Sequence, residues 1–409
     1  MPVIEEFAES APDEDEVFLA HLGGKLSIQP PAELLNARRL SMISTPGVAR
    51  VSSAIAGDPA LAARYTWAHR MVAVVSDGTA VLGLGDVGPA AALPVMEAKS
   101  ALFKALGELD SVPLVLATTD VDEIVETLVR LRPSFGAVNL EDVSAPRCFE
   151  LEARLSRVLD CPVMHNDQHG TAIAVLAALN SAAALLGRDL ASLRTVVAGA
   201  GAAGAACARM LVSAGVGEVV ALDSRGAIHP GRPDLTPAKA ELAALTNPHR
   251  RTGPPAEVLP GADVLIGLSS TTVPPELIAS MAPDPIVFAL SNPTPEITPE
   301  AAYAAGAAVV ATGRSCWPNQ ISNLLACPGV FRGALDSGAG RITERMKLAA
   351  AQALTLLAAD DLARDHIVPD VLDPRVAPEV AAAVAAAAPA ATAAPTAPTP
   401  PTAPATMAD

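Results

Sequence analysis

Residues 193–226, LRTVVAGAGAAGAACARMLVSAGVGEVVALDSRG, contain all the parts of a dinucleotide-binding strand–turn–helix–strand unit. The first apolar strand runs into glycines in the GxGxxG spacing, and the second strand ends in an acid. Gly199 permits the tight turn, Gly201 lets the backbone approach a pyrophosphate, and Gly204 lets the helix pack on the strand. The helix N-terminus offers free N–H groups to phosphate. The expected cofactor-binding residues are Gly199, Gly201, Ala202, Ala203, Gly204 and Asp223.

Asp223 indicates which cofactor this unit prefers. A carboxylate at the end of the second strand can accept a hydrogen bond from the adenosine ribose, and it repels a 2′-phosphate. The sequence therefore favours NAD over NADP. Arg225 lies two residues later and could offset this repulsion, so NADP remains possible.

The rest of the chain alternates short apolar runs with longer helical patterns, which is typical of an α/β protein with parallel sheets. Strands are expected at 71–78, 80–86, 113–120, 135–142 and 161–167, and helices at 122–132, 145–159 and 170–187. We expect two domains: an N-terminal α/β domain for substrate and metal over 21–160, and a Rossmann-type doubly wound parallel sheet with C-terminal helices over 161–388. Residues 1–20 read as an acidic, loosely ordered lead-in. The Ala/Pro/Thr-rich residues 389–409 read as a disordered tail.

The charge and cysteine content narrow the possible partners and compartment. A formal net charge of −16 argues against a nucleic-acid or anionic-membrane partner. The five cysteines form no CxxC pair, which favours reduced thiols in a cytoplasmic protein. The first residues lack a signal-peptide pattern, and no strongly apolar run is long enough to span a membrane.

Acidic side chains stand at the ends of several expected strands, where α/β sheets bind ligands. Asp77, Asp86 and Asp120 could each be an ordinary turn or cap residue. Glu141 and Asp142 stand together, and Asp167 lies in the polar cluster HNDQHG. Three carboxylates suit Mg²⁺ or Mn²⁺. A dinucleotide unit beside such a site suggests oxidative decarboxylation of a hydroxy acid.

Several motifs, in order from about residue 38 to 388, resemble the bacterial short-form malic enzymes. They include VAVVSDGTAVLGLGDVGP, LPVMEAKSALFK, FGAVNLEDVSAPRCFE, HNDQHGTAI, SNPTPEI and ATGRSCWPNQISNLLACPGVFRGALD. The resemblance implies two α/β domains, a divalent metal, NAD or NADP, a small hydroxy-acid substrate and a homodimer. By motif position, the resemblance places the metal on Glu141, Asp142 and Asp167. It makes Lys99 the base that accepts the proton of the substrate hydroxyl. It also puts Asn292 and Asn323 near substrate or cofactor, and Thr171 near the cofactor.

The sequence departs from this family at two acid/base positions. The family's YTPGVA reads ISTPGVA here, so Ser44 replaces a tyrosine that acts as general acid. An aliphatic hydroxyl is a poor acid. The family's HDDQHG reads HNDQHG, so Asn166 replaces the acid that pairs with the lysine, and a neutral Lys99 becomes easier to reach. Ala98 and Ser322 are smaller changes.

These departures leave several functions open. The protein could still decarboxylate malate with water as the proton donor, act on another 2-hydroxy acid, or be a catalytically silent relative. A nucleotide-sensing interaction protein and a plain dehydrogenase without decarboxylation fit less well, because neither needs the three acids. His165 and His169 are expected to be structural.

Overall fold

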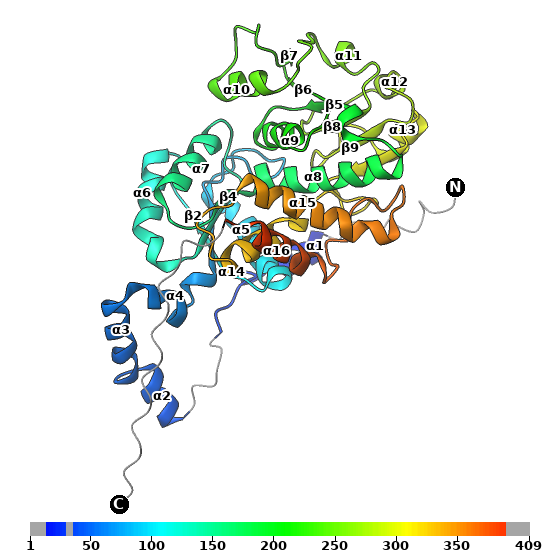
Figure 1. The fold of residues 1–409 in the computed structure, drawn as a ribbon. Helices are drawn as coiled ribbons and strands as arrows, with labels where there is room; N and C mark the ends of the chain where they lie inside the picture. The colour runs from blue at the N-terminus through cyan, green and yellow to red at the C-terminus, as the bar shows by residue number, and fades with distance from the viewer. Residues whose placement is uncertain (1–13, 30–35, 390–409) are drawn as a thin grey trace, which may run out of the picture.

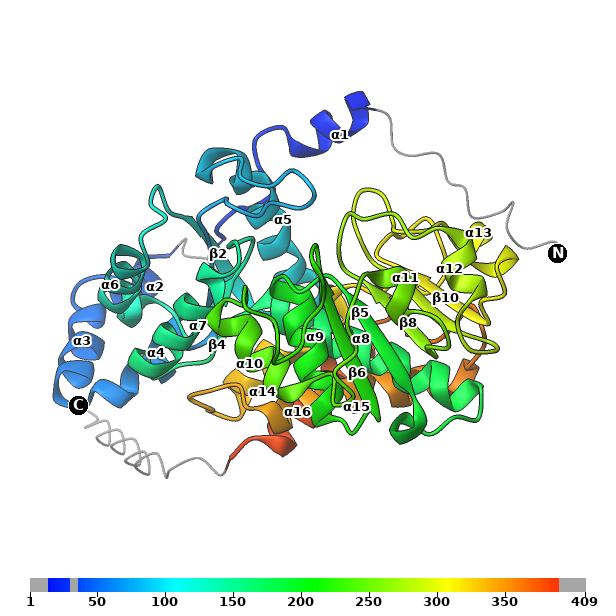
Figure 2. The ribbon, with the colours of Figure 1, turned by 90° about the horizontal axis from the view of Figure 1, so that it is seen from above.

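Figure 1 shows the computed structural model, which describes residues 14–29 and 36–389. Two sheets lie in separate parts of the molecule, with helices between them and on their outer faces (Figures 1 and 2). The predicted two-domain α/β fold is confirmed. In the described ranges no helix combines the length and apolarity that a bilayer crossing needs.

The first sheet has the strand order β2-β1-β3-β4, and all its pairings are parallel. Its strands are β1 (Met71–Ser76), β2 (Asp110–Val115), β3 (Ala137–Leu140) and β4 (Val163–His165). Every residue of β1, β3 and β4 is buried, as expected for parallel strands covered on both faces.

The second sheet has the order β10-β9-β8-β5-β6-β7. Its strands are β5 (Arg194–Ala198), β6 (Glu218–Asp223), β7 (Gly226–Ala227), β8 (Val264–Gly267), β9 (Ile286–Ala289) and β10 (Val309–Thr312). Only β7 pairs antiparallel. The strand order reverses at β5, which pairs with both β6 and β8. Doubly wound sheets bind ligands at this point, and the glycine turn follows β5 directly.

The helices before β4 are α1 (Glu14–His21), α2 (Ala37–Ile43), α3 (Gly47–Gly57), α4 (Ala62–Tyr65), α5 (Pro89–Gly107), α6 (Val121–Leu131) and α7 (Arg147–Val158). Those after it are α8 (Asn166–Leu185), α9 (Ala202–Ser213), α10 (Pro237–Leu245), α11 (Pro255–Val258), α12 (Pro275–Ala279), α13 (Pro299–Ala304), α14 (Cys327–Asp336), α15 (Glu344–Ala358) and α16 (Val376–Ala387). Short 3₁₀ turns cover η1 (Pro59–Leu61), η2 (Ala68–Arg70), η3 (Arg132–Ser134), η4 (Leu190–Ser192), η5 (Asn323–Leu325) and η6 (Ala359–Asp361).

One hydrophobic core joins the two sheets. It contains Val72 and Val74 of β1, Ile173 of α8, Val197 of β5 and Val380 of α16. Helix α8 lies at its centre and packs on α9 and α15 (Figure 1). Because α8 begins with the polar cluster of the sequence, the shared core fixes that cluster between the domains.

The structure corrects several sequence-based expectations. Strand β4 pairs with β3, so the first sheet extends beyond residue 160, where we placed the domain boundary. Residues 80–86 form a turn closed by a bridge between Val81 and Gly85, not a strand. Helix α8 begins at Asn166, four residues before the expected start, because the polar cluster forms its first turn. Helix α1 is ordered within the expected lead-in. Residues 1–13 and the predicted tail from 390 lie outside the described residues.

Helices α2 and α3 form an arm that extends away from the two sheets (Figure 1). Neither helix contains a buried residue. Leu40, Met42, Ile43 and Val48 on this arm are each more than 40% exposed. We call residues 37–57 the N-terminal arm.

Candidate active site

Three carboxylates meet where β3 and β4 end. Glu141 and Asp142 follow β3, and Asp167 lies in the first turn of α8, after β4. Each offers an oxygen within 4.8 Å of the others. Asp142 adopts a left-handed backbone conformation, with φ of 55°, and its N–H donates to Asp167 Oδ2 at 2.9 Å. A non-glycine residue held in this conformation is typical of a functional site. The structure therefore brings together the three predicted metal ligands.

The electrostatics of this cluster fit a bound cation. Burial and the neighbouring carboxylates raise the pKa of Asp142 to about 8 and that of Asp167 to about 7. Asp142 Oδ2 is buried and has no hydrogen-bond partner among the described residues. A divalent cation would remove the mutual repulsion and use the unpartnered oxygen, and oxygen ligands suit Mg²⁺ or Mn²⁺. The residues present therefore fit the predicted metal.

Glu141 is the centre of a buried polar network. Its Oε2 accepts from Asn139 Nδ2 at 2.8 Å and from Asn166 Nδ2 at 2.9 Å, and its Oε1 lies 3.2 Å from Lys99 Nζ. Lys99 Nζ also donates to Asn323 Oδ1 at 3.1 Å. Two of the residues placed near the substrate, Lys99 and Asn323, are therefore in contact with each other and with the acid cluster.

The sequence-based view of Lys99 needs a correction. Burial disfavours its ammonium, but Glu141 and the nearby Asp167 carboxylate outweigh this effect and raise the pKa of Lys99. Asn166 was expected to leave the lysine easier to deprotonate. The structure corrects the partner, because Glu141 serves as the counter-ion of Lys99, whereas the effect of asparagine in place of aspartate on the pKa of Lys99 stays a prediction.

Glu152 of α7 explains why the first turn of α8 is so polar. Its half-buried carboxylate accepts from the His165 N–H at 2.7 Å, from Gln168 Nε2 at 3.2 Å and from His169 Nε2 at 3.0 Å. These contacts hold the pKa of Glu152 below its usual value although burial opposes this. On the far side of the imidazole, Lys347 Nζ of α15 lies 3.1 Å from His169 Nδ1. The polar side chains thus anchor the turn that carries Asp167.

His165, which we expected to be structural, lies at the end of β4 beside the acid cluster, with its Nε2 3.9 Å from Asp167 Oδ2. It is fully buried, and neither ring nitrogen has a hydrogen-bond partner among the described residues. Burial lowers the pKa of His165, so the ring stays neutral. The acids offered as ordinary turn residues also behave as such: Asp120 caps α6, and Asp77 accepts from Thr79 and pairs with Arg147 at 2.7 Å.

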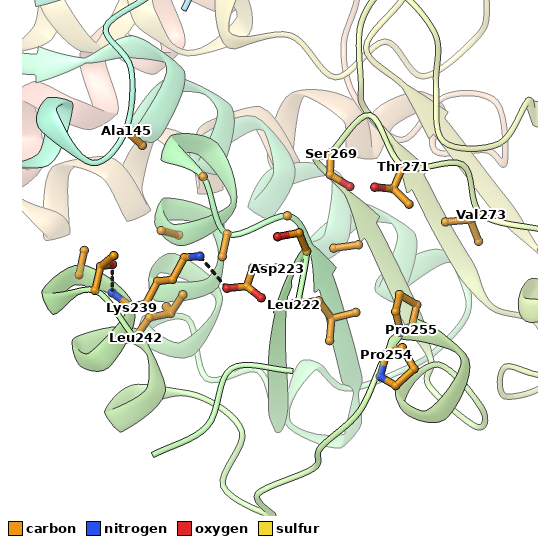
Figure 3. Close-up of a pocket in the computed structure, with 18 of the residues that line it drawn as sticks. Ala145, Leu222, Asp223, Lys239, Leu242, Pro254, Pro255, Ser269, Thr271 and Val273 are labelled. Atoms are coloured by element: carbon orange, nitrogen blue, oxygen red, sulfur yellow. Dashed lines mark hydrogen bonds and ion pairs between the residues drawn. The ribbon is translucent and has the colours of Figure 1, made fainter. Parts of the chain in front are cut away.

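The glycine turn has the geometry that its spacing predicts. Gly199 has φ of 117°, and a Cβ there would lie 2.5 Å from the Leu268 carbonyl oxygen. A Cβ at Gly204 would overlap the Gly199 carbonyl oxygen, so α9 packs directly on the turn. Gly201 faces open space. The turn borders a cavity of about 730 Å³, drawn in Figure 3.

Both domains line this cavity. Gly199, Gly201 and Asp223 form one side, and Ala145 and Phe149 of the first domain form the other. Ala145 lies three residues after Asp142, and none of the three acids is among the residues that line this cavity. The domains also meet at the turn over residues 80–86, where Gly83 packs closely on Asn292. A Cβ at Gly83 would lie only 2.5 Å from the Asn292 carbonyl oxygen. The glycine turn and the segment that follows the acids therefore border the same cavity.

Asp223 is bound by two cations that sequence reasoning missed. Arg232 contacts its carboxylate at 2.9 and 3.1 Å. Lys239 contacts it at 2.6 Å, as Figure 3 shows. Together with the backbone N–H of Arg225 they lower the pKa of Asp223 to about 2. The Arg225 side chain pairs with Asp234 instead, at 2.8 Å. A positive charge that offsets the negative charge of Asp223 is therefore present, as expected, but Arg232 and Lys239 supply it and Arg225 does not.

The remaining predicted residues lie in four places. Ala202 and Ala203 form the start of α9, and Thr171 is half-buried on α8, one turn after Asp167. Asn292 is exposed after β9, and its side-chain nitrogen would lie 2.9 Å from a Cβ at Gly313. Ser44 is exposed at the end of α2, on the N-terminal arm. Figure 1 shows that arm apart from β4 and α8, so this chain does not bring its own Ser44 to the acid cluster.

The fold and the site together define a two-domain α/β protein with a glycine turn typical of dinucleotide binding and a cluster of three acids that suits a divalent cation. Family models agree with this class: the malic enzyme N-terminal domain matches residues 24–156, and the malic enzyme NAD-binding domain matches residues 168–389. The chain belongs to the malic enzyme family.

Individual relatives are similar over most of the chain. A bifunctional malic/malolactic enzyme of Bacillus subtilis is 50% identical over 88% of this chain and 89% of its own length. An NAD-dependent malic enzyme of Geobacillus stearothermophilus is 48% identical over 90% of this chain and 78% of its own. The crystal structure of an NAD-dependent malic enzyme from Thermotoga maritima matches with a TM-score of 0.87 and 43% identity, covering 92% of this chain and 99% of that one.

Proposed function

We propose that this protein catalyses the oxidative decarboxylation of (S)-malate to pyruvate and CO₂, with reduction of NAD or NADP and dependence on Mg²⁺ or Mn²⁺. The observation that carries the proposal is the contact between Lys99, Asn323 and Glu141 within the three-acid cluster, beside the dinucleotide cavity. The names of the relatives support the same reaction.

Each residue of the site has a separate role in this reaction. Glu141, Asp142 and Asp167 would hold the cation, which polarises the carbonyl and stabilises the enolate charge when bound. Lys99 would accept the proton of the 2-hydroxyl in its neutral form, which a bound cation favours by neutralising the carboxylates that raise the pKa of Lys99. The nicotinamide, when bound, would take the hydride from C2. Asn323 orients the substrate beside Lys99, and Asn292 and Thr171 lie toward the cofactor. The bond to the departing carboxylate then breaks, and water protonates the enolate, because Ser44 is a poor acid and lies on the arm, away from this chain's own acid cluster.

Both cofactors are compatible with the cavity. Asp223 favours NAD through its acceptor oxygens, but Arg232 and Lys239 neutralise the charge that would repel a 2′-phosphate. We therefore propose NAD as the preferred cofactor and NADP as a weaker one.

The test follows NAD(P)H absorbance and CO₂ together for a panel of 2-hydroxy acids with Mn²⁺. We expect malate to give both products in equal amounts. Lys99→Ala should lower kcat by roughly 10²–10⁴-fold. Lys104→Ala on the same helix, whose side chain is 61% exposed, is the matched control. Turnover of another hydroxy acid in place of malate would indicate a changed pocket. An absorbance increase without CO₂ would indicate a plain dehydrogenase. The absence of both signals would indicate a catalytically silent relative.

We also propose that the protein is a homodimer and works in the cytoplasm. The exposed apolar side chains of the N-terminal arm support association with a second copy. The five free cysteines suit a reducing compartment. Ile43→Glu on the arm should produce a monomer in light scattering, whereas Val158→Glu, on an equally exposed valine of α7, should not. An unchanged mass for Ile43→Glu would exclude the arm from the interface.

A further inference from the structure

Cys327, the first residue of α14, reaches into the polar network around Glu141. The side chain is fully buried, and its Sγ is in contact with Asn166 Oδ1. Sequence separation between the two residues is 161 positions. Neither the proposed reaction nor the family motifs assign this thiol a role.

The hydrogen-bonding capacities of the three side chains fix the orientation of the Asn166 amide. The Glu141 carboxylate can only accept, so the Asn166 Nδ2 must face it, as the 2.9 Å contact shows. The Asn166 Oδ1 therefore faces Cys327. Only a protonated thiol can donate to that oxygen, and burial raises the pKa of the Cys327 thiol well above its usual range. The thiol therefore donates to the amide oxygen, and the amide nitrogen donates to the carboxylate.

Close packing of α8 makes this contact possible. A Cβ at Gly170 would overlap Asn166 Oδ1 and would lie 2.5 Å from Cys327 Sγ and 3.0 Å from the Cβ of Asn323. Glycine at this position thus lets the thiol and the amide meet beside Asn323. The first residue of α14 and the first residue of α8 are held together at one point.

We propose that Cys327 is a positioning residue: its thiol fixes the Asn166 amide, and the amide fixes Glu141 so that Oε1 remains directed at Lys99 and the cation. The effect reaches the reacting groups only through Asn166. A buried hydrogen bond contributes modestly on its own, but without the thiol the Asn166 Oδ1 would lie buried with no donor, and a shift of the amide toward another donor would loosen its contact with Glu141. The inference rests on the proposed cation site.

The test measures the dissociation constant of Mn²⁺ directly, by the electron paramagnetic resonance signal of the free ion. Cys327→Ala should weaken Mn²⁺ binding by roughly threefold to tenfold, the range expected for one hydrogen bond. Cys327→Ser keeps a donor and should recover most of the affinity. Cys161→Ala, at another buried cysteine, controls for the loss of a buried sulfur.

A double-mutant cycle separates positioning from a general packing defect. In the Asn166→Ala background, Cys327→Ala should cause no further loss of Mn²⁺ affinity, because the thiol has lost the group through which it acts. The KM for NAD should stay constant in all variants while kcat falls with Mn²⁺ affinity. Independent, multiplying effects of the two substitutions, or no effect of Cys327→Ala, would overturn the inference. Failure of the unmodified protein to bind Mn²⁺ would instead refute the proposed cation site.

Discussion

Glu152→Gln is the substitution for which the structure gives the most detailed expectation. Glutamine has the same shape as glutamate but replaces one acceptor oxygen by a donor NH₂. The amide oxygen can still accept from the His165 N–H, and Gln168 can turn its own amide to match. His169 cannot adapt: Lys347 Nζ, which only donates, faces Nδ1, so Nε2 must carry the proton that now points at a second donor.

The expected loss follows from these contacts. Hydrogen bonds to a charged group contribute about 1.5–3 kcal/mol each, and the substitution removes the one from His169 and weakens the other two. We therefore expect a decrease of about 2–3 kcal/mol in the free energy of unfolding. For domains of roughly 150–250 residues, about 2 kcal/mol corresponds to a fall of roughly 4–8 °C in Tm. Because the turn carries Asp167, Mn²⁺ affinity should also fall, by roughly tenfold or more.

The assay combines urea unfolding, thermal unfolding and Mn²⁺ titration of the intact protein. Glu150→Gln is the matched control, because Glu150 lies on the same helix with a side chain that is 61% exposed and pairs only with Arg154. Surface pairs of this kind contribute about 0–1 kcal/mol. The control should therefore retain both stability and metal affinity.

Acidification gives a second check with a defined sign. The folded-state pKa of Glu152 is lowered from its usual 4.5, so its stabilisation is present above that pH and disappears as the pH falls through the folded value. The stability difference between the wild type and Glu152→Gln should thus shrink in acid. Equal Tm values at pH 7, or a difference that stays constant down to pH 3, would refute the role assigned to Glu152.

Two further substitutions test the cofactor cavity and the arm. Lys239→Ala should shift the ratio of kcat/KM for NADP to that for NAD by about tenfold toward NAD, because the Asp223 carboxylate loses a charged partner. Arg225→Ala is the control and should leave the ratio unchanged, because the Arg225 side chain pairs with Asp234. An equal shift in both variants would contradict the assignment. Ser44→Tyr should raise malate turnover by about tenfold or more if a partner's arm supplies this position, since a phenol can donate a proton that serine cannot. A folded, dimeric Ser44→Tyr protein with unchanged turnover would rule out that role.

The local pattern of the sequence determined the dinucleotide unit. The spacing of Gly199, Gly201 and Gly204 predicts which positions need close backbone approach, and the structure confirms the packing at Gly199 and Gly204. Such steric requirements act between neighbours in the chain, so they leave a readable signature. The acids at the strand ends were equally readable, because carboxyl ends of parallel strands meet at one edge of a sheet.

Local pattern failed at the boundaries of elements. The polar residues of HNDQHG suggested a turn, but they form the first turn of α8. Their partner, Glu152, lies on α7, and helix propensity alone carries no information about it. Residues 80–86 alternate like a strand, yet glycines and the contact with Asn292 make them a turn. In each case a tertiary contact outweighed the local preference.

The sequence by itself determined the fold class, the glycine turn and the identity of the three acids. Only the tertiary structure decided the partners: Lys347 beside His169, 178 positions away, Cys327 beside Asn166, and Arg232 and Lys239 around Asp223. It also decided that Ser44 lies on an exposed arm. The physical reason is range: backbone sterics and periodic burial act over a few residues, whereas the partner of a buried charge depends on which distant helices the shared core brings together.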